Sequence, residues 1–508
     1  MDYLLAFSAH EFINFRELEV RSLLELNGLS QDCVPCETNW TAPYISIQLP
    51  NDAVAAKLIE RSVLVKSIYS IWTTASCFDE LLSKVPNFPR TFIDKYLYGS
   101  ESYKIIISSV NKRVPQDDRM LYIRRLIDAH VGATSPVSLD NPTNQIHVIF
   151  EFTKAKAHNK DQSLVRIYYG RLVGESSRKR LLSEFDLSKR TYLGNTTMDV
   201  RLAGIIANAC LCSHGDIVWD PFIGTGGMVL AASVWGAFGA GNDIDYSLVH
   251  GLGASPKAGQ GKRMSGECLR ANYKQYNLQS RYLDVIIADA ASLVALLRNP
   301  NERLLPEASQ SVAPATGLFD AIITDPPYGV RERSCRVASE AVEKEPSLQT
   351  EAYINMITGG KQFAMVPNKD GLVPVPHDLP HYPHKENYPL QETFGDLLRI
   401  AERFLKPKGR LVFWVPVSKS NYTGPSSLPA HPRLKLVAVC EQALNSRISR
   451  FLMVMEKLAA EEPDFCLSAE TLNETVDDDG VMTNPSIRGI PFHLKNFRET
   501  YFQQRANR

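Results

Sequence analysis

Residues 220–227 read DPFIGTGG and stand between an apolar run, GDIVW (215–219), and a helical pattern, TGGMVLAASVWGAF (225–238). The apolar run has the length of a buried strand. Glycine at positions 224, 226 and 227 lets the backbone turn sharply and approach a ligand closely. The helix that follows directs its first amide groups toward the same point. The stretch therefore predicts a ligand-binding turn between a strand and a helix.

The alternation of strands and helices continues on both sides of this turn. Apolar runs predict strands at 239–245, 283–290, 319–328, 409–417, 434–440 and 450–457, and helical patterns lie at 198–212, 266–278 and 393–405. Strands separated by helices form parallel βαβ units, and the last two runs form a final hairpin. Residues 186–460 are therefore predicted to form an α/β, Rossmann-like domain with a seven-stranded, mostly parallel sheet.

Acidic residues end the predicted strands where a ligand would lie. Asp243 follows the next strand and can accept hydrogen bonds from ribose hydroxyls, and Asp289 ends the third strand, where it could meet an adenine amino group. Asp220 precedes the glycine turn, where a carboxylate would repel a pyrophosphate but attract an ammonium group. This favours S-adenosylmethionine over a dinucleotide. The predicted cofactor-binding residues are Asp220, Pro221, Phe222, Gly224, Thr225, Gly226, Gly227, Asp243 and Asp289.

The segment TDPPYG (324–329) follows the apolar run FDAIIT. Its two prolines cannot continue a strand, and they stiffen the turn. The Asp325 carboxylate and the Pro326 carbonyl can accept the two N–H bonds of an exocyclic amino group, which localises its lone pair. Tyr328 offers a flat face on which an extruded base can stack. We predict that Asp325, Pro326, Pro327 and Tyr328 are catalytic residues of an amino-group methyl transfer.

The first 185 residues follow a different pattern. VLVKSIYSIWTTA (63–75), YKIIISSV (103–110) and QIHVIFEFT (145–153) predict strands, and DDRMLYIRRLIDAHV (117–131) predicts an amphipathic helix. These patterns indicate an α+β half, which we divide into residues 1–60 and 61–185.

The most basic short segment is SSRKRLLSEFDLSKR (176–190). A solvated linker and a strip that contacts phosphates both fit its charge. In the second interpretation the contacting residues are Arg178, Lys179, Arg180, Lys189 and Arg190.

Composition narrows the class of protein. The 508 residues include 56 Lys and Arg and 56 Asp and Glu, so a nucleic acid would be bound only through local basic patches. Nine scattered cysteines indicate reduced thiols, and neither Cys33 with Cys36 nor Cys210 with Cys212 has a partner pair at zinc-ribbon spacing, so no metal site is predicted. The N-terminus lacks a basic signal-peptide region, and no apolar run reaches the roughly 18–20 residues of a membrane span. A cytoplasmic protein without a membrane partner is expected.

Several segments interrupt these patterns. Residues 298–317 are rich in Pro, Ala and Ser, and residues 331–392 are long and polar, so both are predicted to be surface loops inserted in the Rossmann-like domain. ASPKAGQGKR (254–263) lacks the first glycine and the Ser or Thr of a phosphate loop and predicts a flexible loop. The acidic stretch 461–480 predicts disorder, and residues 461–508 are assigned to an acidic segment and C-terminal tail.

In the order DPFIGTGG, GNDID, ADA and TDPPYG, the chain resembles the amino-methyltransferases, and most closely the THUMP-containing tRNA guanosine methyltransferases. The resemblance covers nearly the whole chain. An N-terminal ferredoxin-like region, a THUMP-like RNA-binding region to about residue 185 and RTYLGNTTMDVRLAGIIANAC (190–210) match the layout of that family. Within it, the chain is most similar to the catalytic subunits of the eukaryotic enzymes that make N2-methylguanosine at position ten of tRNA.

The resemblance implies S-adenosylmethionine as cofactor and tRNA as substrate, gripped at its acceptor end by the N-terminal half. It also implies a small zinc-ribbon activator subunit as partner in a heterodimer. Asp325 matches the RNA guanosine branch, although DNA enzymes carry Asn or Asp there. Two alternatives stay open: an amino-methyltransferase acting on another RNA or on DNA, and a non-catalytic RNA-binding scaffold with a relic fold. The RNA-like N-terminal half argues against a DNA substrate, and the intact motifs argue against a relic.

Overall fold

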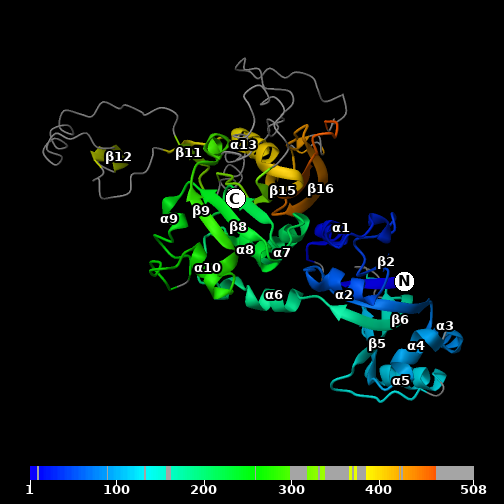
Figure 1. Cartoon of the computed structure of the whole chain (residues 1–508). Helices are drawn as coiled ribbons and strands as arrows, with labels where there is room; N and C mark the ends of the chain where they lie inside the picture. The colour runs from blue at the N-terminus through cyan, green and yellow to red at the C-terminus, as the bar shows by residue number, and fades with distance from the viewer. Residues whose placement is uncertain are drawn as a thin grey trace. The chain divides into compact units, whose positions relative to one another are not determined.

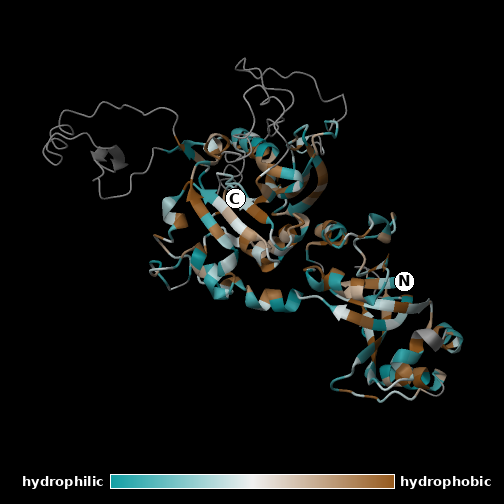
Figure 2. Ribbon diagram, in the orientation of Figure 1, coloured by the Kyte–Doolittle hydropathy of each residue, from teal (hydrophilic) through white to brown (hydrophobic). Residues whose placement is uncertain are grey.

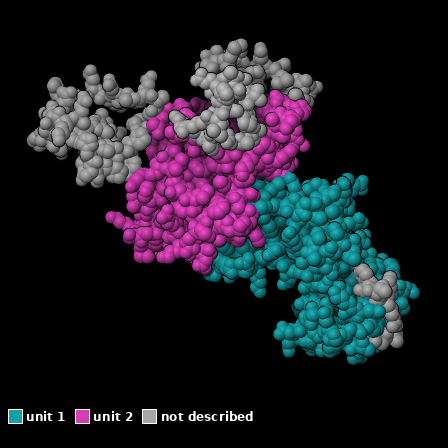
Figure 3. Space-filling model, in the orientation of Figure 1, with its two compact units in different colours: residues 1–190, 199–213 teal, residues 191–198, 214–508 magenta. Residues whose placement is uncertain are grey.

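A computed structural model of the chain describes residues 1–8, 11–88, 90–130, 133–155, 162–257, 259–297, 317–329, 332–337, 365–368, 371–374, 385–420, 422, 424 and 427–464. The chain forms two compact units, one of residues 1–190 and 199–213 and the other of residues 191–198 and 214–508 (Figure 3). Among the described residues, no helix is long and apolar enough to cross a membrane.

The first unit is built on a six-stranded sheet with strand order β2-β1-β3-β6-β5-β4 (Figure 1). Its strands are β1 (Asp2–Phe7), β2 (Tyr44–Gln48), β3 (Val65–Ala75), β4 (Tyr103–Val110), β5 (Asn144–Phe152) and β6 (Leu164–Glu175). The predicted strands at 63–75, 103–110 and 145–153 are confirmed as β3, β4 and β5. Strand β6, which pairs antiparallel with β3 and β5, has no counterpart among the predictions.

Seven α-helices lie among the described residues of this unit, and apolar side chains of α1–α5 pack with those of the sheet. They are α1 (Arg16–Leu26), α2 (Asp52–Glu60), α3 (Phe78–Lys84), α4 (Arg90–Leu97), α5 (Gln116–Ala129), α6 (Arg178–Glu184) and α7 (Val200–Ala209). The predicted helix at 117–131 is confirmed as α5. The predicted boundary at residue 186 would place α7 in the second half, but Arg61 donates hydrogen bonds to the carbonyls of Ala207 and Cys212, at 3.1 and 2.8 Å. These contacts keep α7 with the first unit.

The second unit holds a seven-stranded sheet with order β16-β17-β15-β10-β7-β8-β9. Its strands are β7 (Ile217–Asp220), β8 (Phe238–Asp243), β9 (Tyr282–Ile287), β10 (Phe319–Thr324), β15 (Leu405–Ser418), β16 (Leu434–Ala443) and β17 (Ile448–Lys457). All neighbours are parallel except β17, which runs antiparallel to both β15 and β16. The predicted mostly parallel α/β sheet and its final hairpin are confirmed.

In the part of this unit that the structure describes, the α-helices are α8 (Gly227–Val234), α9 (Tyr246–Val249), α10 (Leu269–Gln275), α11 (Leu293–Leu296) and α13 (Leu390–Phe404). The range 331–392, predicted as a loop, contains regular structure. Strand β11 (Cys335–Val337) pairs with β14 (Lys385–Asn387), β12 (Met365–Asn368) pairs with β13 (Gly371–Pro374), and α13 begins at Leu390. Most of 298–317, and the acidic stretch from residue 465, lie outside the described residues.

The core of the second unit explains why its strands read as continuous apolar runs. Residues 411–417 of β15, in the middle of the sheet, are all buried, as expected for a strand covered on both faces. Helix α13 places Phe394, Leu397, Ala401 and Phe404 on one buried face, at the spacing of an amphipathic helix. Phe404 shares one buried cluster with Phe319 and Leu405, the first residues of β10 and β15.

Candidate active site

Three carboxylates gather at the carboxyl edge of the second sheet. Asp220 ends β7, Asp243 ends β8, and Asp325 directly follows β10. These strands are parallel neighbours in the order β10-β7-β8, so their carboxyl ends lie side by side. The Thr324 hydroxyl donates to Asp220 Oδ1 at 2.7 Å and joins the two predicted motifs. Ligands bind at this edge in doubly wound sheets.

The glycine turn has the backbone conformation that its sequence predicts. Gly224 and Gly226 have φ of +52° and +69°, in the left-handed region that favours glycine. A Cβ atom at Gly226 would lie 2.3 Å from Leu269 Cδ1, so a side chain is excluded there. Asp243 Oδ2 accepts a hydrogen bond from the Gly224 amide at 3.0 Å, which ties the turn to the end of β8.

Burial raises the pKa of these carboxyl groups. The pKa of Asp220 is raised to about 7 and that of Asp243 to about 6, in both cases mainly because burial disfavours the charged form. Burial raises the pKa of Asp325 as well, against the opposing effect of Arg450. Asp220 Oδ1 accepts from the Phe222 amide at 2.9 Å, whereas its buried Oδ2 has no partner among the described residues. A cationic ligand would relieve this concentration of desolvated acids.

Asn242 organises the same edge and was not predicted from the sequence. It is fully buried, and its Nδ2 donates to the carbonyls of Pro221 and Ala288 at 3.0 and 3.2 Å. Its Oδ1 accepts from Trp219 Nε1 at 3.1 Å. The side chain thus connects the turn after β7 with the end of β9. The motif GNDID drew attention to Asp243 alone, because an amide between a glycine and an acid is not distinctive.

Asp289 lies at this edge as predicted, but both of its oxygens accept backbone hydrogen bonds. Its partners are the amide of Ala291 at 3.0 Å and the amide of Val337, in β11, at 2.7 Å. The carboxylate therefore anchors β11 beside the end of β9. Contact with an adenine amino group stays a prediction.

The first and last side chains of the Asp-Pro-Pro-Tyr motif are hydrogen-bonded to each other. Asp325 Oδ1 accepts a hydrogen bond from the Tyr328 hydroxyl, and Tyr328 packs half-buried against the core. Asp325 Oδ2 accepts from Arg450 Nη1 at 2.9 Å. Pro326 is buried and Pro327 half-buried, which holds the turn rigid. Stacking of a base on Tyr328 stays a prediction.

Arg450, near the start of β17, is the functional candidate that the sequence did not reveal. Its Nε donates to Gln442 Oε1 of β16 at 2.7 Å, and its Cζ lies 4.1 Å from the centroid of the Trp414 ring on β15. The side chain is 15% exposed. In the sequence, Arg450 is simply a cation that precedes the apolar run FLMVM, and this does not point to Asp325.

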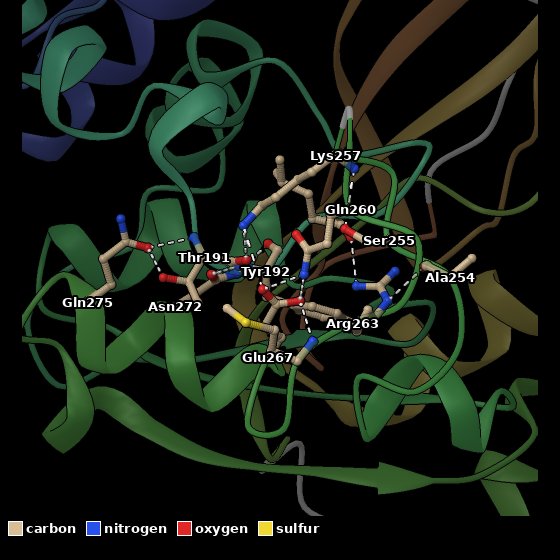
Figure 4. A network of polar contacts seen from close by, with 12 residues as sticks. Thr191, Tyr192, Ala254, Ser255, Lys257, Gln260, Arg263, Glu267, Asn272 and Gln275 are labelled. Atoms are coloured by element: carbon tan, nitrogen blue, oxygen red, sulfur yellow. Dashed lines mark hydrogen bonds and ion pairs between the residues drawn. The ribbon is translucent and has the colours of Figure 1, made fainter.

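The segment before α7 is held by a network of polar contacts, which Figure 4 shows. Lys257 and Arg263 donate to the backbone carbonyls of residues 191 and 193, at 2.6 and 2.8 Å. Asn272 of α10 makes two hydrogen bonds to the backbone of Tyr192, at 2.8 and 2.9 Å. The stretch 254–263, predicted as a flexible loop, is therefore anchored by its basic side chains.

The anchored segment before α7 also contacts the glycine turn. Thr197 Oγ1 lies 3.1 Å from Thr225 Oγ1, and a Cβ atom at Gly194 would lie 2.9 Å from Thr225 Cγ2. Residues 194–197 thus pack directly against the predicted cofactor turn, and a side chain at 194 would displace that of Thr225.

The predicted basic strip is only partly exposed. Lys179 and Arg180, on α6, and Lys189 are exposed. Arg178 is half-buried and pairs with Glu11 at 3.8 Å. Arg190 is 3% exposed and does not share this surface.

The N-terminal part of the chain, residues 1–178, matches the family model described as the Tmrp11 THUMP N-terminal domain. Proteins of similar sequence align with most of this chain. Identity is 34% over 89% of this chain and 83% of the "tRNA (guanine(10)-N(2))-methyltransferase TRMT11" of Xenopus laevis. The protein of the same name from Bos taurus is 35% identical, over 89% of this chain and 88% of that protein. The Homo sapiens protein is 34% identical, with the same coverage of both chains.

Among solved structures, TrmN from Thermus thermophilus is similar with a TM-score of 0.38 and 16% identity, over 90% of this chain and 100% of that one. A possible methylase from Clostridium difficile 630 gives a TM-score of 0.36 and 11% identity, over 91% and 99%.

Proposed function

Because the chain belongs to the family of tRNA (guanine(10)-N2)-methyltransferases, we propose that it transfers a methyl group to the N2 amino group of guanosine at position ten of tRNA. The observation that carries this proposal is the meeting of Asp220, Asp243 and Asp325 at one edge of the sheet. Two of these acids end the strands that frame a glycine turn, and the third opens a rigid Asp-Pro-Pro-Tyr motif. A methyl donor and an amino acceptor need these two halves side by side.

The residues present fit S-adenosylmethionine as the cofactor. The unpartnered Oδ2 of buried Asp220 suits the ammonium group, and Asp243 suits the ribose hydroxyls. A Cβ atom at Gly224 would meet only the Phe222 carbonyl oxygen, at 3.9 Å, so the turn leaves room there for close approach of the ligand. When bound, S-adenosylmethionine supplies an electrophilic methyl group on a positively charged sulfur.

The chain's own residues then orient the amino group. Asp325 and the Pro326 carbonyl accept its two N–H bonds, so the nitrogen lone pair is no longer shared fully with the ring. Tyr328 releases its hydrogen bond to Asp325 and offers its ring to the base. As the N–C bond forms and the bond between the methyl group and sulfur breaks, the nitrogen loses one proton, which the Asp325 carboxylate accepts. Its raised pKa suits that role.

The direct test uses the full chain with its activator partner, isotope-labelled S-adenosylmethionine and unmodified tRNA. We expect label in N2-methylguanosine that maps to position ten after digestion and mass spectrometry. Label in another nucleoside would replace the proposed substrate but keep the chemistry. Bound cofactor without any label would contradict the proposed reaction.

Cofactor affinity should depend on pH through Asp243. The raised pKa of about 6 means that this carboxyl is largely protonated below that pH in the free protein. Ribose hydroxyls donate to the ionised form, so binding lowers the pKa, and affinity must fall as the pH drops through this range. We expect a loss of about tenfold or more between about pH 7.5 and about pH 5, measured by calorimetry with S-adenosylhomocysteine. Asp243→Asn should bind more weakly and show a smaller change with pH, and a constant wild-type affinity would contradict the assignment.

We propose that the exposed cations of α6 and the turn after it contact tRNA phosphates. Replacing Lys179 and Arg180 with alanine should weaken tRNA binding and lower the slope of log affinity against log salt by about 1–2. Lys435→Ala, which removes an exposed cation from β16, is the matched control and should leave the slope unchanged. If the slope is unaltered in the α6 variant, the segment is a solvated linker and does not contact phosphates.

We also propose that a small zinc-ribbon activator subunit covers strand β9. This strand lies at the edge of the sheet, and Figure 2 shows it as mostly hydrophobic. Leu283, Ile286 and Ile287 are 47%, 38% and 47% exposed. A long apolar edge strand invites pairing with another chain. A partner that adds a strand here would bury these side chains.

A further inference from the structure

The guanidinium of Arg450 is fixed from three strands at the place where the target base must enter. Strand β16 supplies Gln442, β15 supplies Trp414, and β10 leads into Asp325. A planar, charged group held by an acceptor, a ring face and a carboxylate has little freedom to turn. Arg450 is therefore pre-oriented in the same way as the acceptor groups of the motif.

One end of this guanidinium has a poor partner. Nη1 and Nε donate to oxygens at 2.9 and 2.7 Å, whereas Nη2 contacts the Met198 sulfur at 3.7 Å. A thioether is a weak acceptor. The side chain is 15% exposed, so a better acceptor can reach it. The guanidinium of Arg450 thus presents Nη2 as a donor beside the acceptor oxygen of Asp325.

Guanine carries the complementary pattern. Its O6 is an acceptor, and its N1 and N2 carry donors along the same edge, whereas adenine has an amino donor where guanine has O6. Building on the proposed function, we propose that Arg450 is a specificity-determining residue that donates to O6 of the target guanine while Asp325 accepts from the N2 amino group. A base with a donor at C6 would face the guanidinium and be rejected.

A simpler role would be to hold Asp325 in place. Loss of Arg450 would then slow methyl transfer to every base that carries an amino group at C2, by the same factor. Recognition of O6 makes a different prediction, because only bases with that oxygen would lose rate. The two roles separate when the base itself is changed.

The test compares four proteins on two substrates, and each variant forms a cycle with the wild type. Single-turnover methyl transfer is measured with tRNA that carries guanosine or 2-aminopurine riboside at position ten, since 2-aminopurine keeps the C2 amino group but lacks O6. It also lacks the N1 proton, but both proteins in a cycle experience that loss, so the cycle isolates the coupling between Arg450 and O6. The variants are Arg450→Ala and Arg450→Lys, and Arg447→Ala removes an exposed arginine from the same hairpin as the control.

We expect the wild type and the Arg447 variant to prefer guanosine, and Arg450→Ala to lower that preference by about tenfold. Arg450→Lys should retain part of it. Cofactor affinity, measured by calorimetry, should be the same in all four proteins and reports correct folding. An unchanged preference in Arg450→Ala, with both rates lowered equally, would overturn the recognition of O6. Absence of any transfer to guanosine by the wild type would instead overturn the proposed function, and this role with it.

Discussion

Replacing Asp325 with alanine should lower the rate of methyl transfer to tRNA by roughly 100- to 1,000-fold. In the proposed mechanism, the carboxylate is one of two acceptors that draw the amino lone pair out of the ring, and it takes the released proton. Neither role can pass to Tyr328, whose hydroxyl donates to Asp325, or to Arg450, which has only donors. The loss should therefore appear in the rate of the chemical step.

The variant also leaves Arg450 without its carboxylate partner, 2.9 Å away in the wild type. Cofactor and tRNA affinities must be measured beside the rate, and we expect both to stay within a few-fold of the wild type, because Asp325 contacts neither the glycine turn nor the basic segment. Asp325→Asn keeps one acceptor oxygen for two donors, so its rate should fall between those of the wild type and the alanine variant. Glu461→Ala, which removes an exposed acid from the same unit, is the control. Near-normal rates with Asp325→Ala would remove this residue from the mechanism.

Most of the cofactor half of the site could be predicted because its information is local. Asp220 and the glycines lie within one turn, and the alternation of strands and helices places Asp243 and Asp325 at the same edge by the rules of parallel sheets. The physical requirement at Gly226, a positive φ beside Leu269, is met only by glycine, so the sequence carries it directly.

Arg450 could not be predicted because its position depends on strand order. It lies 125 residues after Asp325 along the chain. Strand β17 reaches the site only because it inserts antiparallel between β15 and β16. The burial of Arg190 could not be predicted for a related reason, because the charge of a segment does not tell which of its side chains are buried. Both features are determined by tertiary packing, which a local sequence pattern does not specify.

The second large effect is expected at the edge of the sheet. Leu283→Glu combined with Ile286→Glu should weaken binding of the zinc-ribbon partner by at least about 100-fold. Each substitution removes an apolar side chain whose full burial is worth roughly 1.5–3 kcal/mol. Each also places a carboxylate in a contact that would exclude water. Both side chains are substantially exposed in the isolated chain, at 47% and 38%, so the fold itself should tolerate the change.

The opposite edge of the same sheet supplies a matched control. Val437, on β16, is 42% exposed, and Val437→Glu introduces the same charge in a comparable setting. Binding is measured by co-purification and by calorimetry with the separate partner, and cofactor affinity confirms that each variant is folded. Loss of the partner with Val437→Glu, and its retention with the β9 variant, would move the interface to the other edge. If both variants retain the partner, neither apolar edge strand binds it. The exposed side chains of β9 would then contact a different molecule.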